Sequence, residues 1–96
     1  MISAKVYRQK REVLLAASDE ELLGKTFRDG GLKIEVSSFY DGERVTPPAF
    51  LKLLEEATIA NLVGTVAVRA AIEAGFVAEE MVLWIGEVPH AQMVRN

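Results

Sequence analysis

The sequence predicts an α+β domain, with a small mixed or antiparallel sheet of about four to five strands and two to three helices packed mainly on one face. Apolar and polar side chains alternate over residues 2–7 and 32–36, which is typical of strands that bury one face. Thr46 followed by Pro47 is a helix start signal, and residues 65–74 repeat small side chains at helical spacing. No repeat or linker divides the 96 residues, so we expect a single domain over the whole chain.

The N-terminal segment is expected to form a hairpin followed by a short helix. Val13–Ala17 is the predicted antiparallel partner of the first strand. The sequence Ser-Asp-Glu-Glu at residues 18–21 has the spacing of a capping box, in which the serine accepts from an early helical N–H and the last glutamate reaches back. We therefore predict a helix that begins at Asp19 and ends near Gly30, although a glycine in its middle weakens the pattern.

The central segment is expected to contain one strand and one helix. Leu32–Val36 has the clearest strand pattern, and a turn-rich connection over residues 38–43 follows it. Residues 58–63 fit either a further helical turn or a short extended segment, because short apolar runs have no decisive periodicity. The helix that begins at Pro47 is expected to bury Phe50, Leu53, Leu54 and Ala57.

The C-terminal segment is expected to contain a second helix and two strands. The helix covers residues 65–74, and Gly75 is suited to its C-terminal stop. The continuous apolar run Met81–Ile85 predicts a well-covered strand, and Gln92–Arg95 is expected to form a last short strand. Pro89 is expected outside the sheet, because proline has no N–H to donate.

Composition excludes several classes of chemistry. The chain has no Cys, so disulfides, thiolate metal sites and cysteine nucleophiles are excluded. One His cannot build a site of several imidazoles, and no carboxylate spacing replaces it, so we predict no metal and no cofactor. The N-terminus lacks the layout of a secretion signal, and no apolar run approaches the roughly 18 residues that span a bilayer. We therefore expect a cytoplasmic protein with no membrane contact.

The net charge of −3 is unevenly distributed. Residues 1–48 have eight basic and eight acidic side chains, whereas residues 49–96 have three basic and six acidic ones. Basic residues gather at the tip of the first predicted hairpin, where Arg8, Lys10 and Arg11 either contact phosphates or solvate the turn. Because a domain that binds duplex DNA is usually basic overall, direct DNA duplex binding is not expected.

Besides these basic residues, three polar side chains in the segments 57–64 and 86–92 are candidate site residues. His90 is the candidate acid or base, because the ordinary pKa of histidine lies near neutrality, and the alternative is a hydrogen-bonded structural or binding residue. Asn61 lies in an otherwise apolar segment and must find hydrogen-bond partners, either in a site or at a helix cap or bend near Gly64. Gln92 is the third candidate, as an amide that orients a polar ligand.

Four segments of the chain resemble recurring segments of a family of small archaeal proteins, domain of unknown function 424. They are Lys5–Tyr7, Asp19–Thr26, Ala57–Gly64 and Val88–Gln92, and the resemblance covers nearly the whole chain. It implies a single-domain archaeal cytoplasmic protein, and the family has no established activity, cofactor or catalytic residue. The resemblance directs attention to the third and fourth segments, and we predict that these two lie close together in the fold.

Three functions from different classes fit these observations. The first, which we favour, is a binding module for a protein or ribonucleoprotein partner, in translation or another information-processing system, that uses the basic segment or the surface around Asn61 and His90. The second is a small enzyme or ligand sensor in which His90 moves a proton and Asn61 or Gln92 orients a polar substrate. The third is a structural homo-oligomer subunit whose interface is the Met81–Ile85 strand or the alanine-rich helix.

Overall fold

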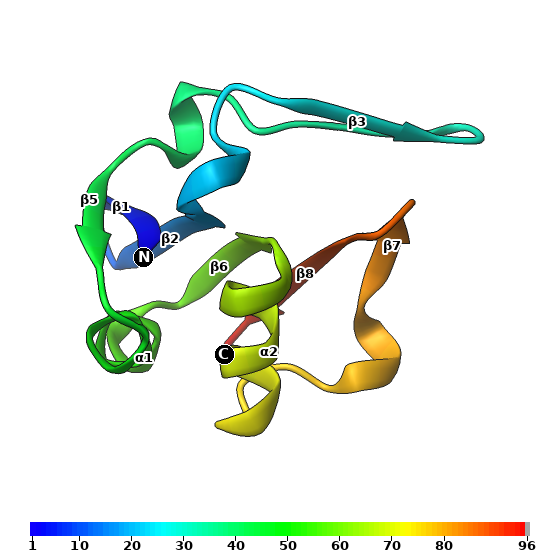
Figure 1. Ribbon diagram of the computed structural model, residues 1–96. Coiled ribbons are helices and arrows are strands. Elements are labelled where there is room, and N and C mark those ends of the chain that lie inside the picture. The colour runs from blue at the N-terminus through cyan, green and yellow to red at the C-terminus, as the bar shows by residue number, and fades with distance from the viewer. Residues whose placement is uncertain (96) are drawn as a thin grey trace.

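The computed structural model describes residues 1–95 and contains two sheets and two α-helices (Figure 1). In chain order the elements are β1 (Ile2–Gln9), β2 (Glu12–Asp19), the 3-10 turn η1 (Glu20–Leu22), β3 (Thr26–Asp29), β4 (Leu32–Glu35), the 3-10 turn η2 (Ser38–Tyr40), β5 (Glu43–Val45), α1 (Pro47–Glu56), β6 (Ile59–Val63), α2 (Thr65–Glu73), the 3-10 turn η3 (Glu79–Met81), β7 (Leu83–Ile85) and β8 (Val88–Val94). The larger sheet has six strands in the order β5-β1-β2-β6-β8-β7, and β3 pairs with β4 in the smaller sheet.

The predicted α+β class is confirmed, with more strands than expected. The larger sheet is mixed, because β2 and β6 run parallel and the other neighbouring pairs are antiparallel. A parallel pair needs a long crossover, and here the connection contains the smaller sheet, β5 and α1. The segment 58–63, undecided from sequence, thus supplies a central strand, and β8 overlaps the predicted strand 92–95 but begins earlier, at Val88.

Both helices lie on one face of the larger sheet, as predicted (Figure 1). Every second residue of a strand faces the same side, so each central strand contributes alternate positions to this core. Phe50 and Leu54 of α1 and Ala67 and Ala71 of α2 are fully buried against it. The strand side chains in this core are Ile2, Ala4, Leu15, Ala17, Val45, Ala60, Leu62, Ala91 and Met93.

Both helices begin where the sequence predicts. Thr46 caps α1, since its Oγ1 accepts from the Ala49 N–H at 3.4 Å, and Pro47 occupies the first helical position. Gly75, with a φ of +83°, follows the end of α2 as a C-terminal stop. Val66 lies outside the buried stripe of α2, because its side chain is 47% exposed.

A second core lies on the opposite face, between the larger sheet, η2 and the β3–β4 hairpin. Ala16 of β2, Val63 of β6 and Val36 are buried there. The hairpin extends over this end of the molecule toward the β7–β8 turn (Figure 1), where the Gly86 N–H donates to Asp29 Oδ2 at 3.1 Å. Ala16 of β2 and Val63 of β6 are therefore covered on this face, and the other face of both strands packs against the helices.

The predicted helix that begins at Asp19 and ends near Gly30 is wrong. Glu20–Leu22 forms only the single turn η1, and β3 and β4 form a hairpin in its place. Gly24 adopts a φ of +83°, which lies outside the right-handed helical region. Phe27 lies in β3 opposite Ile34 of β4, and its side chain packs against the second core.

The capping box is also wrong, and its aspartate caps a different helix. Ser18 lies in β2, where its buried hydroxyl donates to the Asp19 carbonyl oxygen at 2.9 Å. The Asp19 carboxylate accepts from the Val66 and Ala67 N–H groups at the start of α2, each at 2.9 Å. Gly64 has a φ of +109°, and a Cβ there would collide with this carboxylate. Burial raises the pKa of Asp19, and the two N–H donors oppose that shift.

Two predictions near the C-terminus are corrected. The run Met81–Ile85 is not a well-covered strand. Only Leu83–Ile85 pairs, at the sheet edge, and Leu83 and Trp84 of this strand are exposed. Pro89 lies inside β8, opposite Trp84. Its carbonyl oxygen accepts from the Gly64 N–H at 2.9 Å, so it contributes an acceptor to the sheet although it has no donor.

Replacing Asp19 with Ala removes both acceptors and leaves the Val66 and Ala67 N–H groups without that partner. We expect Asp19→Ala to lower the free energy of unfolding by about 2–3 kcal/mol, measured by urea unfolding followed by circular dichroism. Asp19→Asn keeps one acceptor, so its free energy of unfolding is expected to fall less than that of Asp19→Ala. The exposed neighbour provides the control, Glu21→Ala, with a change within about 0.5 kcal/mol. A loss below about 1 kcal/mol for Asp19→Ala would show that this cap does not stabilise the fold.

Candidate functional site

Asn61, His90 and Gln92 lie side by side on the sheet face opposite the helices. In the register of β6 and β8, Asn61 is opposite Gln92, and Val63 is opposite His90. The Gln92 Nε2 donates to Asn61 Oδ1 at 2.8 Å. Asn61 thus forms a cross-strand pair and does not cap a helix or a bend. The prediction that the segments around Asn61 and His90 lie close together is confirmed.

An open depression of about 190 Å³ adjoins this pair and is lined by Met81, Leu83, His90, Ala91 and Gln92. Leu83 is opposite His90 across the β7–β8 pair, and the two side chains therefore share a face. Met81 is 70% and Leu83 45% exposed, so the depression has apolar walls that water reaches. We refer to Asn61, Met81, Leu83, His90 and Gln92 as the amide surface.

The amide pair offers hydrogen-bonding groups to a ligand. The bond between the two side chains uses one Gln92 Nε2 hydrogen and Asn61 Oδ1, which leaves Asn61 Nδ2 and Gln92 Oε1 available. Gln92 is exposed and Asn61 is half-buried. A donor and an acceptor thus stand next to each other, and this is the pattern that a peptide group complements.

His90 is a half-buried imidazole with no charged partner among residues 1–95. Burial lowers the pKa of His90 below its usual 6.5, and no neighbouring charge contributes to the shift. The ring is therefore mostly neutral at neutral pH, with one nitrogen donating and the other accepting. Acid–base catalysis would need a group that orients the imidazole, such as a carboxylate. The surroundings of His90 favour hydrogen bonding to a ligand over proton transfer.

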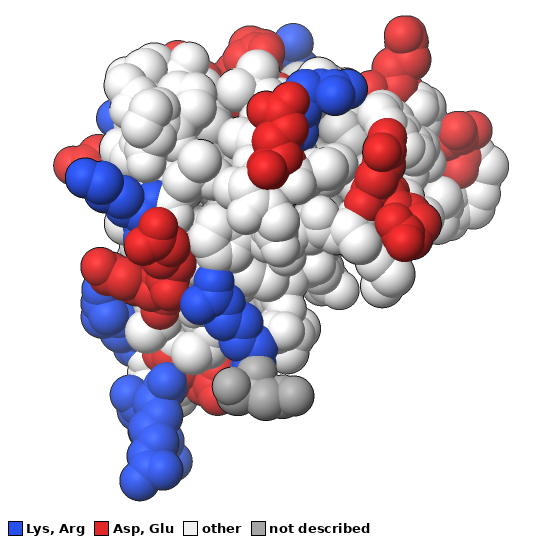
Figure 2. All heavy atoms as spheres, turned by 90° about the horizontal axis from the view of Figure 1, so that it is seen from below, with Lys and Arg blue, Asp and Glu red and all other residues white. Residues whose placement is uncertain are grey.

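The basic residues predicted for phosphate contact lie apart from the amide surface. Lys10 and Arg11 form the turn between β1 and β2, next to the N-terminal end of β6, where the Val13 N–H donates to Thr58 Oγ1 at 2.9 Å. Arg8 forms an exposed ion pair with Glu56 of α1 at 3.8 Å. On the face seen in Figure 2, acidic side chains accompany the basic ones, and one side shows acidic side chains alone. The predicted basic residues at the β1–β2 turn and the predicted polar residues on β6 and β8 thus belong to separate surfaces.

A second concave feature lies between α2 and β7. A cavity of about 60 Å³ is lined by residues that include Val68, Arg69, Ile72, Glu79, Trp84 and Pro89. A wider hollow of about 220 Å³ at the α2 N-terminus is lined by residues that include Glu21, Leu22, Thr65, Val66, Glu87 and Pro89. Thr65 and Pro89 line both hollows, so the two hollows adjoin, and we refer to them together as the α2–β7 groove.

Trp84 is the functional candidate that sequence reasoning missed. It is opposite Pro89 on the helical face of β7 and is 53% exposed. A continuous apolar run predicted burial, since such runs are typical of strands covered on both faces. The overlooked signal is charge, because Glu79, Glu80 and Glu87 flank the run closely on both sides. Acidic flanks of this kind indicate a solvated sheet edge.

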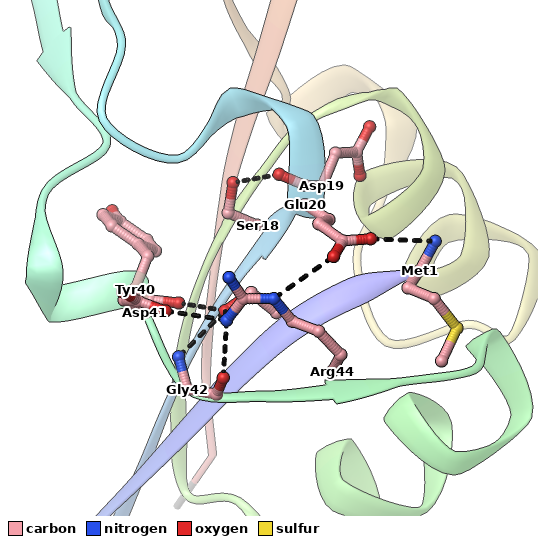
Figure 3. Close-up of polar contacts among 9 residues, drawn as sticks. Met1, Ser18, Asp19, Glu20, Tyr40, Asp41, Gly42 and Arg44 are labelled. Atoms are coloured by element: carbon pink, nitrogen blue, oxygen red, sulfur yellow. Dashed lines mark hydrogen bonds and ion pairs between the residues drawn. The ribbon is translucent and has the colours of Figure 1, made fainter.

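A polar cluster around Arg44 has a structural role (Figure 3). The guanidinium donates to Asp41 Oδ1 and to the Gly42 carbonyl oxygen, each at 2.7 Å, and to Glu20 Oε2 at 3.4 Å. Glu20 also lies 4.0 Å from the ammonium group of Met1. Two carboxylates thus balance the charge of Arg44, and the cluster joins β5 to η1 and the N-terminus.

Within residues 1–95, no group of three or more His, Asp or Glu side chains has an arrangement that could hold a metal ion. The helices in this part of the chain all fall short of the length and apolarity that a bilayer crossing requires.

The single histidine of the chain permits a direct test of its environment, by NMR titration of the His90 ring. We expect a folded-state pKa below 6.5, because burial disfavours the charged form. A depressed pKa adds stability above the unfolded-state value, and this stability is lost as the pH falls through the folded-state pKa. His90→Gln is therefore expected to lose less stability than wild type as the pH falls from 6.5 toward that value. A measured pKa at or above 6.5 would contradict this description.

Comparisons with known proteins agree with the fold and with the resemblance noted in the sequence. The family described as "Protein of unknown function (DUF424)" matches residues 7–95. The crystal structure of an uncharacterized conserved protein from Methanopyrus kandleri is similar, with a TM-score of 0.80 and 27% sequence identity, over 99% of this chain and 94% of that chain. No curated protein matches the sequence significantly. Since the family match extends over most of its length, the chain belongs to the DUF424 family of proteins of unknown function.

Proposed function

We propose that the protein is a binding module for a protein partner, which it contacts with the β7 end of its sheet. The observation that carries this proposal is the exposure of apolar side chains around β7. Leu83 is 45% exposed on one face of the strand, Trp84 is 53% exposed on the other, and Met81 just before it is 70% exposed. Apolar side chains gathered at a sheet edge are typical of interaction sites and are otherwise a liability.

The amide surface supplies polar groups that can select the partner. Protein interfaces combine apolar contacts with hydrogen bonds at defined positions. Here Leu83 and Met81 provide the apolar contacts, and the pair of Asn61 and Gln92 provides a donor and an acceptor. Strand pairing fixes the backbone at Asn61, Leu83 and Gln92, so that little order has to be gained there on binding.

The charge of this end favours a protein over a nucleic acid. Between residues 65 and 88, Arg69 is the single basic side chain, whereas four exposed glutamates are present, Glu73, Glu79, Glu80 and Glu87. Acidic side chains repel the phosphates that dominate nucleic-acid affinity. The stacked rings on the other half of the sheet, Tyr7 and Phe39 with centroids 5.1 Å apart, contact each other and present no open stack for a base.

The enzyme or ligand-sensor alternative has weaker support. Asn61 and Gln92 converge as that hypothesis requires, and His90 adjoins them. The imidazole nevertheless has no orienting carboxylate among residues 1–95, and the depression beside it is open to solvent. A site with these properties is better suited to contact the surface of a partner protein than to enclose a small substrate.

Affinity capture from a native lysate tests the proposal, with tagged wild type compared with the double variant Leu83→Ala/Gln92→Ala. Glu43→Ala/Lys52→Ala is the matched double control, because both side chains are also exposed but lie on β5, at the opposite edge of the sheet, and on α1. We expect a protein that is recovered by wild type and by the control after nuclease treatment. Its recovery with the double variant is expected to fall about tenfold, in line with loss of a central interface contact.

Three outcomes would contradict the proposal, provided that circular dichroism shows each variant folded. Equal recovery by all three proteins would place the contact elsewhere. Loss of the partner on nuclease treatment would show that RNA makes the contact. The absence of any specific partner would favour the ligand-sensor alternative, which a metabolite screen would then test.

A further inference from the structure

The α2–β7 groove combines an apolar floor with an acidic rim. Trp84, Val68 and Pro89 are among the residues that line it, and the Trp84 side chain is half-exposed. Its exposed ionisable side chains are three acids against one base, namely Glu21, Glu79 and Glu87 against Arg69. A ligand for this groove therefore needs apolar surface and positive charge together.

Asp19 makes the wider hollow unsuitable for an anion. The N-terminus of a helix would ordinarily attract a phosphate or a carboxylate through its unpaired N–H groups. In α2 the Asp19 carboxylate already accepts from the Val66 and Ala67 N–H groups, at 2.9 Å each. With Glu21 and Glu87 beside it, this end of the groove has a negative field.

The free edge of β7 matches an extended ligand. The strand stands last in the order of the larger sheet, so within residues 1–95 no strand pairs with its outer edge. An extended segment can add to such an edge through main-chain hydrogen bonds, while alternate side chains enter pockets on the sheet face. The cavity beside Trp84, about 60 Å³ in volume, is of a size for a short aliphatic group.

We infer that the α2–β7 groove binds a basic, extended protein segment. One aliphatic side chain of the segment contacts Trp84, and flanking Lys or Arg side chains pair with Glu79 and Glu87. The inference rests on the proposed function, whose partner class it narrows. A second copy of this chain is a poorer occupant, because a symmetric contact through the same groove would bring its acidic rims together.

The single tryptophan of the chain makes the groove directly observable. The probe is a blocked peptide with a central Leu and two Lys on each side, titrated at low salt while Trp84 fluorescence and backbone amide NMR shifts are recorded. We expect a saturable blue shift and amide shifts confined to α2, η3 and β7. The affinity is expected to fall as salt is added, because the contributing ion pairs are exposed. A matched peptide with Glu in place of Lys is expected to produce no saturable change.

Paired variants assign the charge contribution. Glu79→Gln/Glu87→Gln is expected to lower the affinity for the lysine peptide about fivefold, which corresponds to the loss of two partly exposed ion pairs. The control Glu43→Gln/Glu55→Gln changes side chains on β5 and α1. Its affinity for the lysine peptide is expected to stay within about twofold of the wild-type value. All four side chains are exposed, so none of these substitutions removes a core contact.

Several results would overturn the inference. They are no saturable shift with the lysine peptide, an equal response to the glutamate peptide, or shifts mapped to other elements. A single-stranded RNA that moves the same amides more strongly would assign the groove to nucleic acid. A Trp84 blue shift that appears with protein concentration alone, with a dimer in sedimentation, would assign it to a second copy. If the peptide fails while lysate capture still depends on Leu83 and Gln92, the proposed function stands without this inference.

Discussion

The carboxylate of Asp19 caps α2 and joins the C-terminal ends of the parallel strands β2 and β6 to the start of that helix. Since β2 and β6 run parallel, their C-terminal ends lie together, with Ser18 opposite Val63. The residue that follows Ser18 therefore meets the start of the helix that follows β6. Asp19 accepts two N–H bonds there, and Gly64 leaves the space that its carboxylate needs. An antiparallel β6 would place the opposite end of the strand beside Asp19, and α2 would begin without this cap.

This framework packs the middle of the sheet between two cores and leaves apolar side chains exposed at its β7 end. β2 and β6 are buried from one side by α1 and α2 and from the other by η2 and the β3–β4 hairpin. On the helical face coverage ends at β7, where Trp84 faces water. On the opposite face it ends earlier, because Asn61 of β6 is half-buried and Gln92 of β8 and Leu83 of β7 are exposed. The amide surface extends from β7 across β8 to Asn61 of β6, and the α2–β7 groove lies on the opposite face. Both proposals therefore follow from one property of the fold, namely where its packing stops.

Sequence patterns predicted the features that depend on local chemistry. The first hairpin, the Thr46 cap of α1 and the glycine stop of α2 each follow from a few adjacent residues, and the pairing of Asn61 with Gln92 agrees with the predicted proximity of their segments. Features set by distant partners were not predictable in this way. Residues 18–21 have the local spacing of a cap, but the helix that Asp19 caps begins more than forty residues later. An apolar run such as that around Trp84 likewise cannot distinguish a central strand from an edge strand, because the difference lies in its neighbours.

We expect the capped centre of the sheet to be the most stable part of the fold and β7 at its edge to be less stable. Native-state hydrogen exchange, resolved by NMR for each backbone amide, tests this expectation most directly. Amides that exchange only by global unfolding report the most stable part of a protein, and local opening reports the least stable part. We expect the Val66 and Ala67 amides to exchange as slowly as the central amides of β2 and β6, and the amides of β7 to exchange through local opening. Fast exchange at Val66 and Ala67, or β7 amides as protected as those of β6, would contradict the account.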